Sequence, residues 1–459
     1  MMQLWGLACR VLVKDVTRRL DECHASTVID PRRAVRLAPG SRVLIAGGGP
    51  AGSFSALHLL HYARQAGLDL EVILLEPRDF GQPGPGGCNK CAGILSSTLI
   101  RDLEGLGLQL PQELVQSELE TYILHLGGMQ LTLKRPDPSR RIVSIYRGSG
   151  PRAGTPPYPR SFDAWLLEQA QAAGAVVRRE RARAVHRGER PTIFTAREAL
   201  QADLVILATG VNSRAPLEPR WGYRPPRREV MAQDEVLLPA GLLDRQVRVF
   251  FDLPPGLVFG GLIPKGPYAN ISLLGRGLPP GAVAEFLEVH GLQRLLPEQA
   301  FSLCGCTPHV AVSSAVGYYG ERMVVVGDAA VTRLYKDGIG AAFTTAQAAA
   351  RTAVEVGVAR RDFVEGYRPV CRGIAQDNLY GRLLFRLWTL TRRSPFLLDS
   401  WRRAITNEAS LPAASRVHTR TLWGMFTGDD TYRQMFRLSL TRRALRSLWW
   451  GAIQTWRAR

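Results

Sequence analysis

The chain has 459 residues, of which 46% are hydrophobic and 22% charged, so it is long enough for two or three globular domains and too apolar to be disordered. No run reaches the ~18 to 20 apolar residues that a membrane-spanning helix needs, and seven cysteines in a chain of this length do not form a disulfide scaffold. The formal net charge is +19, and the segment 371–459 contributes +11 of it, with 16 arginines and 5 acidic residues.

The first predicted elements form a βαβ unit. Residues 1–40 are expected to be an N-terminal extension with one amphipathic helix near Leu4–Leu20. The apolar stretch 42–46 then predicts a strand, 53–65 a helix and 70–75 a second strand. A strand, a glycine turn, a helix and a strand in this order open a parallel sheet.

The turn of this unit carries a dinucleotide fingerprint, Gly-x-Gly-x-x-Gly over residues 47–52, with an acidic residue 24 positions further on. The glycines allow a tight turn and a close approach to a pyrophosphate, which the helix N-terminus faces, and Glu76 would accept the ribose hydroxyls. The predicted nucleotide-binding residues in this part of the chain are Gly47, Gly49, Pro50, Ala51, Gly52, Glu76 and Pro77.

The stretch GPGGCNKCAGILSS (84–97) follows the second strand and places Cys88 two residues before Cys91. It allows a metal site, a redox disulfide or a glycine-rich loop against a cofactor. Cys304-Gly-Cys306 is an imperfect second half of a ligand set, with no histidine spacing to complete it, so no metal is predicted. A cofactor loop is favoured, and a disulfide within either cysteine pair stays open.

The rest of the chain alternates between two kinds of pattern. A helix and a strand are predicted in 161–177, and a buried strand in 201–210 ends at Gly210. Short apolar runs between 245 and 277 predict an antiparallel sheet, after which a buried strand (322–330), an alanine-rich helix (340–358) and amphipathic helices beyond 371 follow.

These patterns predict an α/β fold with a Rossmann-type domain, an inserted mixed or antiparallel sheet that binds substrate, and a helical C-terminal region. The predicted boundaries are 1–40 for the extension; 41–125, 155–225 and 320–370 for the nucleotide-binding domain; 126–154 and 226–319 for the insertion; and 371–459 for the C-terminal region.

The segment VVVGDAAVTRLYKDGIGAA (324–342) indicates which dinucleotide is bound. Gly327 and Asp328 end a strand, so that Asp328 can hydrogen-bond the ribityl chain of a flavin. Gly338-Ile339-Gly340 starts the next helix, whose N-terminus can approach the flavin edge where negative charge develops on reduction. The predicted cofactor is therefore FAD.

Together these motifs resemble flavoproteins of the p-hydroxybenzoate hydroxylase fold from about Ser41 to Val370, and within them the geranylgeranyl reductase group. Lys90-Cys91-Ala92-Gly93 is similar to that group's flavin loop, and Arg160-Ser-Phe-Asp163 to a superfamily motif. The resemblance implies flavin contacts at Cys91, Ala92 and Gly93, and substrate contacts at Phe259, Gly261, Ile263 and Pro264.

The implied reaction is hydride transfer from reduced flavin to a carbon–carbon double bond of an isoprenoid or similar lipid chain, with Cys91 and Tyr335 as candidate catalytic residues. Gly261 and Ile263 stand where the group has aromatic residues, and Tyr335 where it has proline. The sequence does not identify the electron donor, for which NAD(P)H and a ferredoxin-like protein are both candidates. The alternatives are an FAD-dependent monooxygenase and a membrane-surface flavoprotein electron carrier.

The C-terminal region holds six of the nine tryptophans among its arginines. Such helices suit contact with an anionic membrane surface, and they equally suit a cap over the substrate cavity. No nucleic-acid-binding module is recognisable, so no nucleic acid is expected. The odd cysteine count and the lack of a recognisable signal peptide predict a cytoplasmic protein, with a peripheral position at the inner membrane surface as the alternative.

Overall fold

The computed structural model describes residues 35–88, 92–126, 128–239, 241–252, 254, 256–279, 281–296 and 303–458. The helix predicted near Leu4–Leu20 lies outside these residues, as does Cys91. Among the described helices, none is both long and apolar enough to cross a membrane.

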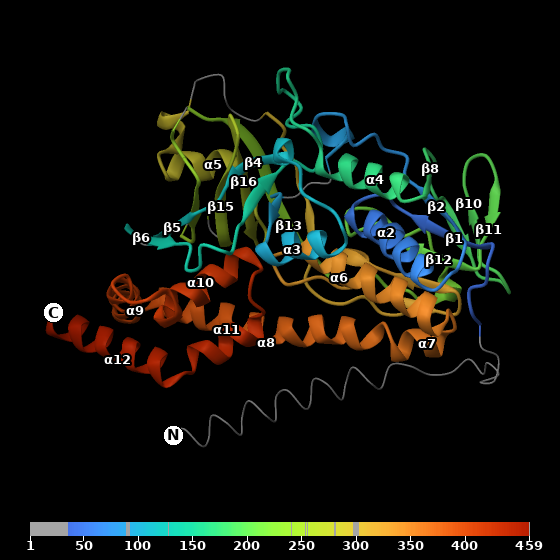
Figure 1. The fold of residues 1–459 in the computed structure, drawn as a ribbon. Coiled ribbons are helices and arrows are strands. Elements are labelled where there is room, and N and C mark those ends of the chain that lie inside the picture. Colours follow the sequence, from blue (N-terminus) through green and yellow to red (C-terminus); the bar gives the residue numbers. More distant parts are fainter. Residues whose placement is uncertain are drawn as a thin grey trace. The chain divides into compact units, whose positions relative to one another are not determined.

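A six-stranded sheet with the order β18-β19-β12-β1-β2-β8 forms the nucleotide-binding domain (Figure 1). All its neighbouring strands are parallel except β18 and β19. The central strands are buried along nearly their whole length, as expected where helices cover both faces. The strands are β1 (Ser41–Ala46), β2 (Leu70–Leu75), β8 (Val176–Arg178), β12 (Leu204–Leu207), β18 (Tyr319–Gly320) and β19 (Met323–Val325).

Helices α2 (Pro50–Gln65), α4 (Phe162–Ala172) and α6 (Gly338–Arg351) belong to this domain, and α2 packs against both of the others. The helix predicted for 340–358 is α6 followed by a single π-type turn, Thr352–Val356. Helix α3 (Ser97–Gly105) follows the loop that contains Cys88, and the Ser96 side chain caps it by accepting a hydrogen bond from the Leu99 N–H.

Two small three-stranded sheets were not predicted. One has the order β3-β7-β4 and the other β11-β10-β9. Their strands are too short for a two-residue alternation of apolar and polar side chains to stand out in the sequence. They are β3 (Ile94–Leu95), β4 (Val115–Glu118), β7 (Val143–Ile145), β9 (Ala184–His186), β10 (Thr192–Phe194) and β11 (Ala199–Gln201).

The inserted domain is a seven-stranded mixed sheet with the order β17-β13-β16-β15-β14-β5-β6, in which only β5 and β14 are parallel neighbours. Residues 121–125 of β5 were assigned to the nucleotide-binding domain by the predicted boundary at 125, which is therefore wrong by the length of a strand. The strands are β5 (Thr121–Leu126), β6 (Met129–Lys134), β13 (Arg228–Leu237), β14 (Gln246–Phe250), β15 (Leu257–Lys265), β16 (Tyr268–Gly275) and β17 (His309–Ala311).

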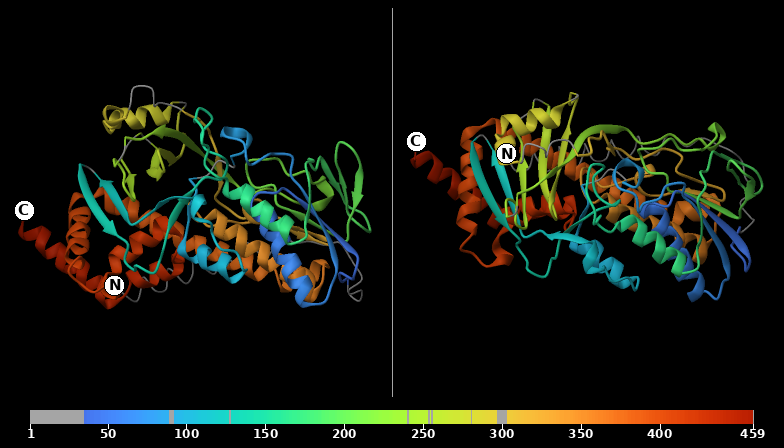
Figure 2. Two further views of the ribbon diagram at one scale, coloured as in Figure 1. Left: turned by 45° about the horizontal axis from the view of Figure 1, so that its top comes forward. Right: turned by 90° about the horizontal axis from the view of Figure 1, so that it is seen from above.

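The two faces of this sheet are covered differently. One face packs on α5 (Ala282–Val289), with Phe286 and Leu273 in its core. The other face shares one hydrophobic core with the C-terminal helices, in which Tyr122 and Val249 of the sheet meet Trp388 and Trp423. Figure 2 shows the red C-terminal helices beside strands β5 and β6.

From α7 to residue 458 the chain consists of helices joined by short loops. These helices are α7 (Arg360–Glu365), α8 (Arg368–Arg393), α9 (Pro395–Glu408), α10 (Val417–Thr427), α11 (Tyr432–Ser439) and α12 (Arg442–Arg457). Helices α8 to α11 pack against one face of the seven-stranded sheet.

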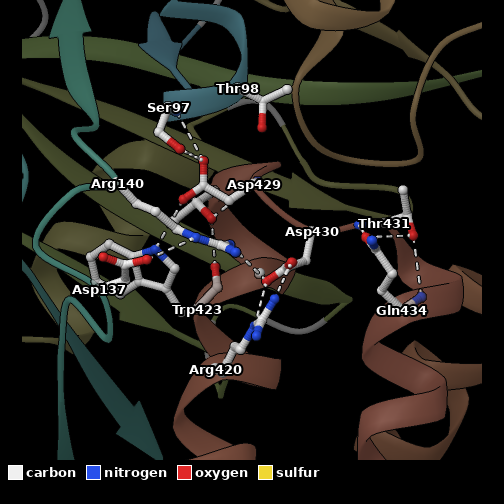
Figure 3. A network of polar contacts seen from close by, with 12 residues as sticks. Ser97, Thr98, Asp137, Arg140, Arg420, Trp423, Asp429, Asp430, Thr431 and Gln434 are labelled. Carbon is white, nitrogen blue, oxygen red and sulfur yellow. Dashed lines mark hydrogen bonds and ion pairs between the residues drawn. The ribbon is translucent and has the colours of Figure 1, made fainter. Parts of the chain in front are cut away.

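The loop between α10 and α11 fastens this cover to the rest of the protein (Figure 3). The Asp429 carboxylate accepts hydrogen bonds from the N–H and the hydroxyl of Ser97, at 2.9 and 2.8 Å. The Asp430 carboxylate accepts from Arg140 at 3.0 Å and from Arg420 at 2.9 Å. Residues from α3, from the segment after β6 and from α10 thus converge on two adjacent aspartates.

Candidate functional site

The glycine turn after β1 is so tightly packed that no other residue fits it. Gly47 has φ +105°, and a Cβ there would lie 2.6 Å from the carbonyl oxygen of Ala208, just beyond β12. A Cβ on Gly52 would lie 1.8 Å from the carbonyl oxygen of Gly47. Helix α2 therefore begins directly at the end of the strand, with Gly49 as its N-cap and Pro50 as its first residue.

Glu76 follows β2 and lies beside this turn. Its side chain is almost completely buried. One carboxylate oxygen accepts a hydrogen bond from the Gly48 N–H at 2.9 Å, and the other accepts from the backbone and the guanidinium of Arg78. These bonds fix the carboxylate in place, and Oε2, which accepts only one of them, keeps a lone pair for a ribose hydroxyl.

The turn after β19 lies against the N-terminus of α2, beside the glycine turn. Gly327 has φ +63°, and a Cβ there would lie 2.7 Å from the Cβ of Ala51 in α2. Asp328 follows it, and its Oδ1 atom is buried without a hydrogen-bond partner among the described residues. The hydroxyl of Thr209, next to Gly210 after β12, is also buried without a hydrogen-bond partner among the described residues. Burial raises the pKa of Asp328 above its usual range.

Buried polar atoms usually have a hydrogen-bond partner in folded proteins, and a group bound at this edge of the sheet could supply one to Asp328 and Thr209. The glycine cradle, Glu76 and the N-terminus of α2 suit the phosphates and ribose of a dinucleotide. Asp328 can accept a hydrogen bond from a ribityl hydroxyl, and Gly338, at the start of α6, lies next to it. The residues present therefore fit FAD.

The loop that leads into α6 is strained. The backbone φ angles of Tyr335 and Asp337 are +61° and +47°, values that residues other than glycine rarely adopt. The Asp337 carboxylate caps α6 by accepting from the Gly340 N–H at 3.2 Å, and it forms an ion pair with Arg333. Burial raises the pKa of Asp337 to about 6. Such strain persists only where surrounding contacts enforce it, and it concentrates at functional sites.

Lys336, between these two residues, points away from the sheet edge into the C-terminal cover. Its ammonium donates to the carbonyl oxygens of Gly424 and Asp430, at 2.7 and 2.8 Å, and lies 4.1 Å from the ring centre of Tyr432. Burial lowers the pKa of Lys336 to about 7. The loop before α6 and the helical cover are therefore one connected unit.

Tyr335 connects this loop with the seven-stranded sheet. Its hydroxyl donates to a carboxylate oxygen of Glu229, in β13, at 2.8 Å, and Glu229 lies 3.7 Å from the guanidinium of Arg276. The Arg276 side chain is 81% exposed, so a short chain of polar groups leads from Tyr335 to solvent. Burial, together with the hydrogen bond to Glu229, raises the pKa of Tyr335 well above its usual value.

The predicted flavin loop is described only in part, because Lys90 and Cys91 lie outside the described residues. Ala92 packs against the hydrophobic core that the sheet shares with the C-terminal helices. Gly93 has φ +71°, and a Cβ there would lie 2.2 Å from the carbonyl oxygen of Ile145. The disulfide question for Cys88 and Cys91 stays open for the same reason.

The predicted substrate residues lie along β15. Phe259 and Ile263 belong to the core on the side of the C-terminal helices, and Phe259 meets Phe426 with 6.1 Å between ring centres. Gly261 has room for a Cβ, which would come no closer than 3.8 Å to neighbouring atoms. The carbonyl oxygen of Pro264 accepts a hydrogen bond from the Ser144 hydroxyl.

The sequence interpretation missed a buried polar cluster beside the predicted flavin loop. The Lys265 ammonium lies 3.7 Å from the Glu235 carboxylate and 4.7 Å from the ring centre of Tyr146, whose hydroxyl is buried without a partner among the described residues. A Cβ on Gly93 would lie 3.1 Å from this ammonium. Burial raises the pKa of Glu235.

Neighbouring strands extend this cluster with uncharged groups. The Gln233 amide donates to Ser272 at 2.8 Å and to Asn270 at 3.2 Å. All the polar residues involved alternate along their strands and so share one face of the sheet. That alternation in β13 and β16 was the available signal in the sequence.

The motif Arg160-Ser-Phe-Asp163 is divided between two environments. Asp163 is completely buried and forms a two-point ion pair with Arg147, at 3.0 and 2.9 Å. Arg160 is 42% exposed and pairs with Glu113 and Glu168. The charge of Arg147 also acts on Asp328 and lowers its pKa, although the larger effect of burial raises it. Spacing alone did not indicate Arg147.

No protein-family model matches the sequence, and no curated protein matches it. Solved structures do share its fold. A geranylgeranyl bacteriochlorophyll reductase-like protein from Thermoplasma acidophilum aligns with a TM-score of 0.60 and 15% identity, over 92% of this chain and 99% of that one.

A flavin-dependent brominase aligns with a TM-score of 0.58 and 14% identity, over 87% of this chain and 98% of that one. 2-Methyl-3-hydroxypyridine-5-carboxylic acid oxygenase aligns with a TM-score of 0.55 and 18% identity, over 75% of this chain and 92% of that one. The predicted p-hydroxybenzoate hydroxylase-like fold is confirmed. A fold that reductases, halogenases and oxygenases share does not select a reaction.

Proposed function

We propose that the protein is an FAD-dependent oxidoreductase, and that it reduces a carbon–carbon double bond of an isoprenoid or similar lipid chain. The observation that carries the first part is the convergence at one sheet edge of the glycine cradle, the fixed carboxylate of Glu76 and the unpartnered oxygen of Asp328. These groups would hold the diphosphate, the ribose and the ribityl chain of FAD, respectively.

The lipid substrate is supported by the face of β15 that carries Phe259 and Ile263. Around them lie further aromatic side chains of the shared core, including Phe251, Tyr122 and Phe426. At the end of β15 and on β13 the same face becomes polar, at Lys265 and Glu235 respectively. A surface that is apolar at one end and polar at the other suits a chain with a polar head.

When bound, reduced FAD supplies a hydride to one carbon of the double bond. The other carbon needs a proton, which this chain must hold. The hydroxyl of Tyr335 is our candidate, because the Glu229 carboxylate that accepts its hydrogen bond can take up a proton and return it to the tyrosine. Cys91, in the flavin loop, is the second candidate. The surrounding aromatic side chains would exclude water from the reacting carbons.

The main alternative is an FAD-dependent monooxygenase that acts on an aromatic or apolar substrate. It would use the same cofactor edge and the same sheet face, and it is favoured only by the shared fold. A membrane-surface electron carrier would need the flavin but no proton donor. The reaction products distinguish these three activities.

The cofactor is tested by absorbance of the purified protein. We expect the two absorbance bands of oxidised flavin near ~370 and ~450 nm, with FAD released on denaturation. Asp328→Ala should weaken FAD binding by about tenfold, since it removes one hydrogen bond to an uncharged hydroxyl. Asp69→Ala, an exposed change just before β2 at the opposite end of the strand, is the matched control. A colourless protein that does not take up added FAD would refute the proposal.

The reaction is tested with the flavin-loaded protein, an unsaturated isoprenoid alcohol in detergent, and either NAD(P)H or a chemically reduced ferredoxin as donor. A reductase yields a product heavier by two hydrogens without consuming oxygen. Tyr335→Phe should lower kcat with little change in KM, whereas Tyr380→Phe in α8 should not. Oxygen consumption with incorporation of oxygen into the product would establish the monooxygenase instead.

A further inference from the structure

Helix α12 leaves a stripe of large apolar side chains uncovered. Leu445, Trp449 and Trp456 are 49%, 68% and 74% exposed. Their spacing of four and seven residues places them on one face of the helix, because an α-helix repeats every 3.6 residues. Single exposed apolar residues are ordinary on protein surfaces, but three of this size in one row are not.

A different face of α12 packs against the rest of the C-terminal region, so the direction of the stripe is fixed. Ala444, Gly451 and Thr455 are buried, and a Cβ on Gly451 would lie 2.2 Å from the carbonyl oxygen of Ser400 in α9. The carbonyl oxygen of Ala444 is 3.1 Å from a ring nitrogen of His418 in α10. The stripe therefore stays on the surface of the folded C-terminal region.

Arginines border the stripe. Arg442, Arg446 and Arg457 are exposed on the neighbouring sector of the same helix. The segment 431–459 contains seven arginines and no acidic residue. A second copy of this helix would bring like charges together, so self-association through the stripe is disfavoured. The partner that fits is both apolar and negatively charged.

We propose that α12 binds the surface of an anionic phospholipid bilayer, with its axis parallel to the membrane. Leu445, Trp449 and Trp456 would insert at the boundary between headgroups and acyl chains, and the arginines would contact lipid phosphates. The structure narrows the surface to one helix, since Trp388 and Trp423 lie in the hydrophobic core instead. This inference does not rest on the proposed reaction, although a membrane-bound substrate would agree with it.

The test is co-sedimentation of the full-length protein with vesicles of phosphatidylglycerol and phosphatidylcholine at low salt. We expect binding that increases with the anionic fraction, falls with added salt and shifts tryptophan emission to the blue. Arg442→Glu/Arg446→Glu should weaken binding by at least about tenfold, since each arginine near an anionic surface contributes measurably. Arg181→Glu/Arg183→Glu, exposed in the nucleotide-binding domain, makes the same charge change and should not.

A second variant separates insertion from charge. Leu445→Ser/Trp449→Ser/Trp456→Ser alters only exposed side chains, so it should keep the far-ultraviolet circular dichroism of the original protein and lose the blue shift. The proposal is overturned if the full chain does not bind anionic vesicles, if both charge variants weaken binding equally, or if the triple variant abolishes a dimer and leaves vesicle binding unchanged.

Discussion

Two adjacent glycines in β15, Gly260 and Gly261, differ in the space that they leave for a side chain. A Cβ on Gly260 would lie 2.8 Å from a methyl of Leu273 and 3.0 Å from the ring of Phe286, on the face covered by α5. A Cβ on Gly261 would meet nothing closer than 3.8 Å, on the opposite face beside Ile263. The second position therefore accepts a Cβ at ordinary contact distance, on the sheet face that carries the predicted substrate residues.

We expect Gly260→Leu to lower the free energy of unfolding by about 2–3 kcal/mol, because it overpacks the core. Gly261→Leu should change it by less than about 1 kcal/mol and should restrict the length of substrate that is accepted. Denaturant titrations of the two variants, followed by turnover assays over a series of chain lengths, check both statements. Equal losses of stability would contradict the assignment of the two faces.

His58 in α2 is a buried histidine that makes stability depend on pH. Both ring nitrogens are buried without a hydrogen-bond partner among the described residues, and the ring packs on Phe343 of α6 at 4.7 Å. Burial, assisted by the charge of His61, lowers the pKa of His58 to about 3. The folded state therefore binds fewer protons than the unfolded state between about pH 6.5 and 3, so acid in this range destabilises the fold.

Replacing His58 with Leu should remove this pH dependence. The variant should be as stable as the original protein or more so at pH 7, because an unpartnered buried polar group costs about 1–3 kcal/mol. Its advantage should grow as the pH is lowered from about 6.5 to about 4. Urea unfolding at pH 7.5 and 4.5 measures this difference. An advantage that shrinks in acid would show that the folded protein can protonate the ring.

At the scale of elements, the loop between α10 and α11 joins three parts of the fold. Burial alone would raise the pKa of Asp430, but hydrogen bonds and charges from Arg420 and Arg140 outweigh this effect and hold it below its usual range. The carboxylate side chain is only 5% exposed. Asp137 lies 3.7 Å from the same Arg140 and is 49% exposed. One arginine therefore has a buried and an exposed partner.

Asp430→Asn should lower the free energy of unfolding by about 3 kcal/mol at pH 7, as is usual when one partner of a buried ion pair is removed. Asp137→Asn should cost less than about 1 kcal/mol. Since a lowered carboxylate pKa stabilises the fold above the unfolded pKa, the effect of Asp430→Asn should fade as the pH falls below about 4. Thermal unfolding at pH 7 and 3 tests both. Equal losses for the two variants would argue against the buried position.

At the scale of the whole molecule, the sheet and the C-terminal helices share one core. Trp423, Leu422 and Met435 of the helices pack in the same cluster as Leu124 and Val249 of the sheet. None of the members of this cluster lies in α12. The helical region is therefore structural up to α11, whereas α12 lies outside the shared core.

Two truncations test this division. Removal of 371–459 should leave an insoluble chain without bound flavin, since it uncovers one face of the seven-stranded sheet. Removal of 441–459 should leave a soluble protein that keeps its flavin absorbance. Expression, gel filtration and absorbance measure both outcomes. A soluble, flavin-loaded product from the longer truncation would contradict the shared core.

The sequence by itself determined the features that depend on local chemistry. The turn at Gly47–Gly52, the strand ends at Glu76 and Asp328 and the two classes of sheet were all predictable, because glycine tolerance and side-chain periodicity act over a few residues. The solved structures that share this fold confirmed the prediction made from these features. The roles of the predicted site residues stay predictions, and Cys91 lies outside the described residues.

Only the tertiary structure decided which distant residues meet. It paired Asp163 with Arg147 instead of Arg160, joined Tyr335 to Glu229 and placed Lys265 beside Gly93. It also divided the C-terminal tryptophans between a core and an exposed helix. Side-chain type and spacing cannot give these results, because burial and charge pairing depend on the packing of segments far apart in the chain.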